Sequence, residues 1–188
     1  TVVGSAAPQL LKNQEALQAV TKEVIVFSKS AGTDLAGAAR VVTGAINLFG
    51  LEASEAARVV NVLAAGEKEG SATTLEAAEA LEKAGGAARL SGASIEETTS
   101  AIQLLAKDSL KGSEAGTQLR NVFLKLATAD ALPRTAQAAF KSAKIDIEKL
   151  TDTTVPLSEK LIELQKLNGK TAELTKIFGT ENVNAAIS

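Results

Sequence analysis

The chain has 188 residues, a net charge of −2 and a pI near 5.4, and 45% of its residues are hydrophobic but only 3% aromatic. This length and apolar share suffice for one sizeable domain or two small ones, so the composition excludes a disordered segment. The absence of Cys and His excludes disulfides and every site built on a thiolate or an imidazole, and the weakly acidic charge without Trp or Tyr predicts no direct nucleic-acid site.

The first predicted helix covers about residues 9–31, where Val20, Val24 and Phe27 recur at helical spacing. The pattern leaves open whether this helix packs on its neighbours or extends away from them. The longest strongly apolar run of the chain, Val24–Phe27, is far shorter than the roughly 20 residues that span a bilayer. No membrane segment is therefore predicted in this portion.

Further helices are predicted between regularly spaced glycines. About every 20 residues the chain contains a glycine, which suits a helix end because it adopts a left-handed conformation without strain. Residues that cap a helix start, and acids that stabilise its first turn, follow each glycine. The glycines are Gly32, Gly50, Gly70, Gly92 and Gly112. The starts are Thr33–Asp34, Ser54–Glu55, Thr73–Thr74 with Glu76, Ser94 with Glu97, and Ser113–Glu114.

Pairs of these starts repeat at a longer interval, since Asp34–Leu35 and Ser54–Glu55 are echoed by Thr74–Leu75 and Ser94–Ile95. The connections are short, which favours antiparallel neighbours. The segments between them have helical periodicity and lack strand alternation. The sequence therefore predicts an all-α fold, an irregular bundle of stacked antiparallel helical hairpins with about 8–10 helices.

A boundary is predicted near residue 150. Ile145–Ile147 alternates briefly between apolar and polar residues and is interpreted as extended, and the polar Thr151–Thr154 stretch follows it. Residues 1–150 are therefore predicted to form the main helical-hairpin domain, and residues 151–188 a C-terminal helical segment packed on it.

Within the C-terminal segment, Pro156 suits the first turn of a helix. Leu157, Leu161, Leu164 and Leu167 would then lie on one side of this helix, which we expect to pack on the rest of the protein.

No residues for catalysis are predicted. Paired carboxylates can catalyse hydrolysis, but Glu96–Glu97, and Glu52 with Glu55, stand at helix starts, where a negative charge stabilises the helix dipole. The sequence has no phosphate-binding glycine loop and no His or Cys for a metal. We therefore expect no enzyme activity, no catalytic residue, no cofactor and no metal site.

The segment Lys111–Arg120 has an unusual composition for a helix start. Gly116 falls inside the predicted helix, where glycine costs roughly 1 kcal/mol relative to alanine, so a neighbouring group is expected to need the space. Arg120 lies one turn later and is interpreted as an internal clamp on carbonyl groups of a neighbouring helix end, with a partner-binding arginine as the alternative. The structural or interaction candidates are Gly112, Gly116, Thr117 and Arg120.

Five blocks between about Ala16 and Ile187 carry a likeness to a known family. The most specific is Gly112–Arg120, with its glycine, x, x, x, glycine, threonine, x, leucine, arginine pattern. The others are Gly50–Ala57 running into Val62–Ala65, Gly92–Thr98, Val155–Leu157 and Ile177–Gly179. In this order they resemble the core region of phage tail tape measure proteins. Lys107–Leu110 departs from the asparagine and glycine that usually precede the signature, which puts the local turn in doubt.

The resemblance implies a structural component of the bacteriophage tail that sets tail length and takes part in tail assembly and genome delivery. It implies a place in the tube lumen of the virion tail, synthesis in the host cytoplasm from a phage or prophage gene, and no catalytic residues. The implied partners are the tail tube protein, tail assembly chaperones and copies of the protein itself.

The chain is expected to be a fragment of a larger protein, because it begins at Thr1 and contains no Met. A helix rises only about 1.5 Å per residue, and a segment folded into hairpins spans even less length than a single helix. We therefore expect an assembly or docking unit rather than the stretch that measures tail length. A helical adaptor or chaperone-like protein-binding module is the alternative, and it predicts an exposed apolar groove. A lytic enzyme fragment is a third hypothesis.

Overall fold

The computed structural model describes residues 2–187, which form helices and turns and contain no strand. The α-helices are α1 (Val2–Ala6), α2 (Gln14–Ser30), α3 (Leu35–Phe49), α4 (Ala56–Glu69), α5 (Thr74–Leu90), α6 (Ile95–Lys107), α7 (Gly112–Ala127), α8 (Arg134–Ser142), α9 (Ile147–Thr151), α10 (Leu157–Leu164), α11 (Thr171–Phe178) and α12 (Val183–Ile187). Short 3-10 turns lie at Pro8–Lys12, Ala53–Glu55, Ala129–Ala131, Gln165–Leu167 and Thr180–Asn182.

The predicted all-α class is confirmed. The described residues form twelve α-helices rather than about 8–10. The sequence did not predict α1 and α9, which have only five residues each. Helices this short give too few apolar repeats for periodicity to reveal them.

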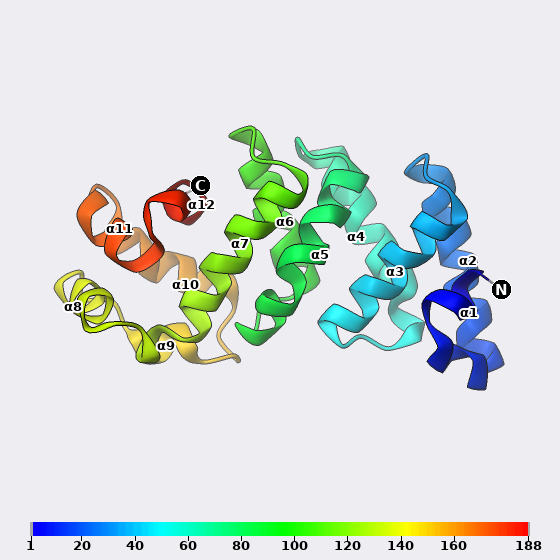
Figure 1. The fold of residues 1–188 in the computed structure, drawn as a ribbon, viewed down its shortest axis with the longest axis horizontal. Helices are drawn as coiled ribbons and strands as arrows, with labels where there is room; N and C mark the ends of the chain where they lie inside the picture. Colours follow the sequence, from blue (N-terminus) through cyan, green and yellow to red (C-terminus); the bar gives the residue numbers. More distant parts are fainter. Residues whose placement is uncertain (1, 188) are drawn as a thin grey trace.

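Helices α2 to α7 are stacked side by side in two layers (Figure 1). Helices α3, α5 and α7 pack in succession along one layer, and α2, α4 and α6 along the other. Helix α1 packs on α3 at the N-terminal end of the stack, and α8 to α12 lie at the opposite end (Figure 1). Each hairpin thus buries its apolar face against its neighbours, as in helical repeat proteins.

Side-chain caps begin several helices where the sequence predicts them. The Asp34 carboxylate accepts the N–H three residues further along at 2.6 Å, at the start of α3. Thr73 and Ser94 form capping boxes with Glu76 and Glu97 at the starts of α5 and α6. Each box satisfies two amides that the first turn would otherwise leave without a partner.

Two predicted boundaries differ in the structure. Gly112 is the first residue of α7 rather than the end of α6, and the start of α7 has no side-chain cap at Ser113. The turn after α6 is made instead by Ser109, which adopts a positive φ of 66°. Left-handed conformations are less common for serine than for glycine, so the sequence pointed to the wrong residue.

The predicted first helix is divided at Asn13. Pro8–Lys12 form a 3-10 turn, and the Asn13 side chain then caps α2 by accepting the Ala16 N–H at 3.1 Å. Helix α2 buries Val20 and Phe27 and packs on α3 and α4 instead of extending away from them.

The C-terminal helices do not continue the two layers. Helix α8 packs on α11, α9 on α7 and α10, and α12 on α7 and α11. Asp146 has an extended backbone and its side chain caps α9, but Ile147 is already the first residue of this helix, so the extended interpretation of Ile145–Ile147 is wrong at Ile147. The boundary near residue 150 stays a prediction.

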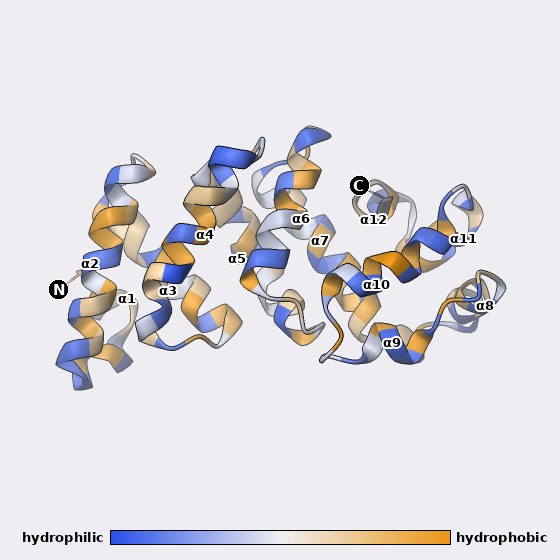
Figure 2. Cartoon of the chain, turned by 180° about the vertical axis from the view of Figure 1, so that it is seen from behind, coloured by the Kyte–Doolittle hydropathy of each residue, from blue (hydrophilic) through white to orange (hydrophobic). Residues whose placement is uncertain are grey.

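A cluster of buried apolar residues runs from Val3 to Phe178. Much of it is alanine, which lets helix backbones approach closely, while larger side chains fill the wider spaces. Figure 2 shows hydrophobic and hydrophilic residues alternating along most helices, as amphipathic packing requires. The fully buried phenylalanines are Phe27, Phe123, Phe140 and Phe178.

Candidate functional site

The four candidate residues lie on α7, which packs on α5. Gly112 and Gly116 are buried against α5, whereas Thr117 and Arg120 are exposed. The signature therefore has a packing side and a solvent side.

Gly116 lets the backbones of α7 and α5 come into contact. A Cβ on Gly116 would lie 2.4 Å from the carbonyl oxygen of Ala80 and 2.7 Å from its Cα, which is closer than side-chain atoms can approach. This is the close neighbour that a glycine inside a helix predicts.

Gly112 belongs to the same contact. Its φ of 55° lies in the left-handed region that favours glycine. A Cβ on Gly112 would lie 2.7 Å from Oε2 of Glu79 on α5. The positive φ therefore accounts for the glycine at position 112, whereas Gly116 permits the close packing of the α5 and α7 backbones.

Thr117 and Arg120 form the solvent side. The Thr117 hydroxyl donates to the Ser113 carbonyl at 2.8 Å, within α7 itself. The Arg120 guanidinium is exposed and has no hydrogen bond or ion pair within residues 2–187. The clamp interpretation of Arg120 is therefore wrong, because the side chain reaches no carbonyl of another helix.

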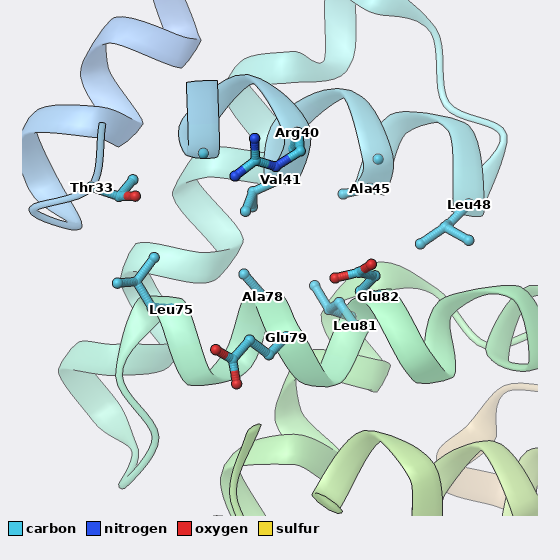
Figure 3. Close-up of a pocket in the computed structure, with 12 residues that line it drawn as sticks. Thr33, Arg40, Val41, Ala45, Leu48, Leu75, Ala78, Glu79, Leu81 and Glu82 are labelled. Carbon is cyan, nitrogen blue, oxygen red and sulfur yellow. The ribbon is translucent and has the colours of Figure 1, made fainter. Parts of the chain in front are cut away.

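A groove of about 420 Å³ lies between α3 and α5 (Figure 3). The Arg40 side chain of α3 stands at one wall and that of Glu82 on α5 at the other, whereas the carboxylate of Glu79 points away from α3, toward Gly112. The two helices do meet further along, since a Cβ on Gly85 would lie 3.2 Å from Cβ of Leu48. The apolar walls are formed by Val41, Ala45, Leu48, Leu75, Ala78 and Leu81.

A polar joint that the sequence did not reveal connects α10 to the turn between α5 and α6. Lys160 is only 1% exposed, and its Nζ donates to the Ser91 carbonyl at 2.5 Å. Oε1 of Glu97 accepts the Leu157 N–H at 2.7 Å, while Oε2 closes the capping box of α6. One carboxylate thus satisfies the starts of two helices.

The contact between α10 and the turn that joins α5 to α6 also accounts for the glycine at position 92 and for the shifted pKa of Lys160. A Cβ on Gly92, which has a φ of 82°, would lie 2.2 Å from the Thr153 carbonyl oxygen. Burial lowers the pKa of the Lys160 amine, and the negative charges of Asp152 and Glu97 oppose this shift. The C-terminal segment therefore docks through a buried amine without a carboxylate in direct contact.

Gln103 of α6 holds the turn between α4 and α5. Its Oε1 accepts the Ala72 N–H at 2.7 Å, and its Nε2 donates to the Ala72 carbonyl at 3.0 Å. The amide passes so close to Gly70 that a Cβ there would lie 2.0 Å from Oε1 of Gln103.

The acidic pairs considered for catalysis have structural partners. Arg58 donates to both oxygens of Glu96, at 2.6 and 2.8 Å, and this lowers the pKa of Glu96. The Glu55 carboxylate accepts the Glu52 N–H at 3.0 Å, which with Arg58 lowers the pKa of Glu55. Both shifts favour ionised carboxylates over proton donors at neutral pH.

Neither a metal cluster nor a membrane helix is found in the described part of the chain. Residues 2–187 contain no group of three or more acidic side chains placed to hold a metal ion. None of their helices combines the length and the apolar character needed to cross a bilayer.

The chain is similar to phage tail proteins along nearly its whole length. A family described as "Phage-related minor tail protein" matches residues 2–179. The tape measure protein of Pneumococcus phage Dp-1 is 30% identical over 174 residues, which cover 88% of this chain but only 15% of that protein. No solved structure matches the chain. These matches confirm the resemblance carried by the α7 signature and the blocks around it, and the chain belongs to the family of phage-related minor tail proteins.

Proposed function

We propose that this chain is a folded docking unit of a tape measure protein, the tail component that sets tail length. The observation that carries the proposal is the similarity to the Dp-1 tape measure protein over 88% of the chain. In this proposal the unit lies in the tube lumen and takes part in tail assembly and genome delivery. It is made in the host cytoplasm, from a phage or prophage gene, and contacts the tail tube protein, tail assembly chaperones or further copies of the protein.

The stacked fold supports docking rather than measuring. An extended helix gains about 1.5 Å of length per residue, but in a stack of hairpins each helix returns along the previous one. Helices α2 to α7 lie side by side in such a stack (Figure 1). We therefore place the measuring stretch in other parts of the tape measure protein.

Duplicating residues 34–73 in frame tests this assignment, because it adds one hairpin to the stack. We expect virions with tails of unchanged length in electron micrographs. If the segment were part of the ruler, its roughly 40 additional helical residues would lengthen the tail by about 60 Å. A helical duplication of equal length outside residues 1–188 is the control that should lengthen the tail.

A protein-binding role is favoured by a second observation, the groove between α3 and α5 with its apolar walls. An adaptor or chaperone-like module would need such a surface. A protein-binding module inside a tail protein would itself be a docking unit. The adaptor hypothesis and the docking-unit hypothesis therefore differ only in whether the domain acts inside the tail.

A further inference from the structure

We propose that the groove between α3 and α5 binds an amphipathic helix from a different polypeptide. The bound helix presents small and apolar side chains to the groove, an acidic residue to Arg40 and a basic residue to Glu82 (Figure 3). This inference goes beyond the proposed function, since it concerns what the groove binds and is independent of tail length.

The contact between α5 and α7 shows what a glycine inside a helix does in this fold. Gly116 admits the Ala80 backbone, where a Cβ would lie 2.4 Å from the carbonyl oxygen. Gly44 likewise lies inside α3, but a Cβ there would meet no atom within 4 Å. Glycine weakens a helix relative to alanine, so nothing within residues 2–187 accounts for Gly44. The backbone of a helix from another polypeptide, approaching α3 at this position, would account for it.

The groove has the dimensions of a helix. Gly37 and Gly44 are seven residues apart and so lie on one face of α3, with Val41 between them and Leu48 one turn further along. The stretch from Gly37 to Leu48 is about 16 Å long at the helical rise per residue. This length accommodates about three turns of a docked helix.

The charges around the groove complement such a helix. Arg40 on one wall and Glu82 on the other form no hydrogen bond or ion pair within the described range 2–187. Arg58, by contrast, is bound to two carboxylates of its own chain. A helix between the walls, with an acid on the α3 edge and a base on the α5 edge, would pair these charges and fix its own direction.

The exposed apolar stripes of this chain do not fit these requirements, which argues against a second copy as the occupant. On α2, Ile25 and Val26 are 40% and 45% exposed, but Lys22 and Lys29 share their face and would place positive charge beside Arg40. On α10, the exposed pair Leu161 and Ile162 belongs to a helix of only eight residues, shorter than the groove.

Photocrosslinking in phage-producing cells tests the proposal. The full-length protein carries a photoreactive phenylalanine derivative at Leu75, which lines the groove and is 37% exposed. We expect a crosslinked peptide from another protein that is helical and has the acidic and basic edges described above. Gly44→Phe, which fills the groove at a position with free space, should lower the crosslink yield at least tenfold. Ala64→Phe, at an exposed position of α4 outside the groove, should leave it unchanged.

Charge reversal supplies the second measurement. Glu82→Lys should lower the yield at least fivefold, and changing the facing basic residue of the captured helix to glutamate should restore it. The proposal is overturned by the absence of a crosslink, by crosslinks only to a second copy of this chain, or by a yield that Gly44→Phe does not change. Tail length in the duplication experiment is a separate readout, so either proposal can fail alone.

Discussion

Gly116 of α7 lies directly against the backbone of Ala80 in α5, where an added Cβ would be 2.4 Å from the carbonyl oxygen. The residue that marks the family signature is thus also the one that sets how closely two helices of the stack approach. Its role in the fold follows from its size, because the contact is made by backbone atoms that cannot rotate away.

Replacing Gly116 with alanine should destabilise the chain by about 2 kcal/mol, because α5 and α7 would have to separate. The better helix propensity of alanine, about 1 kcal/mol, offsets only part of the cost. Unfolding in urea measures the change in the free energy of unfolding.

Gly86→Ala is the matched control for this prediction. Gly86 is an exposed glycine inside α5, and the nearest atom to its added Cβ is Cδ2 of Leu48 at 4.0 Å. This variant should be as stable as the parent or up to about 1 kcal/mol more stable. Equal effects of the two substitutions would show that close approach at Gly116 does not matter.

Gln103→Leu should destabilise the turn between α4 and α5 by about 2–3 kcal/mol, because it leaves the Ala72 N–H and carbonyl buried without partners. Gln103→Glu keeps an acceptor for the Ala72 N–H but buries a carboxylate whose second oxygen would face the Ala72 carbonyl, so it should destabilise the turn as well. Amide hydrogen exchange at Ala72 reports the opening of the turn, and protection that stays the same in Gln103→Leu would refute the assigned role.

Lys160 should make stability rise with pH in the alkaline range. Its folded-state pKa is lowered by burial below the ordinary 10.5, so between the two values the unfolded chain binds more protons than the folded one. Raising the pH through this window therefore removes a destabilising charge, at no more than about 1.4 kcal/mol per pH unit. Unfolding in urea from pH 7 to pH 10 measures this slope.

Lys160→Met is the comparison for the Lys160 prediction, since it keeps an unbranched apolar side chain as far as Cε and removes the amine. The stability of the parent relative to this variant should increase as the pH rises. A difference between the two chains that is constant with pH would mean that the amine is not desolvated at the joint with Ser91.

The helices of the stack were predictable because their signals are local. Asp34, Thr73 and Ser94 cap α3, α5 and α6 through residues three positions away, and such spacing is visible in the sequence. The need for space at Gly116 was predictable for the same reason, although its neighbour Ala80 was not.

The polar joint of α10 was not predictable, because it depends on residues distant in the sequence. The spacing of leucines places Leu161 on the buried side, yet Leu161 is 37% exposed and Lys160 is 1% exposed. The helix is rotated toward Ser91, 69 residues away, whose carbonyl accepts the Lys160 amine. A lysine beside an apolar stripe ordinarily reaches solvent, so periodicity places Leu157 and Leu164 correctly on the buried side but misses Lys160.

Arg120→Ala should change the free energy of unfolding by less than about 0.5 kcal/mol, because an exposed side chain without a partner contributes little to stability. A clear drop in melting temperature would instead restore the clamp interpretation. The alternative predicted from the sequence is that Arg120 binds a partner, which we propose is another tail component. Phage carrying Arg120→Glu should therefore yield at least tenfold fewer complete tails by electron microscopy. Lys107→Glu, a charge reversal at an exposed position of α6, is the control. Equal losses in both variants would show that the effect comes from surface charge in general and not from Arg120.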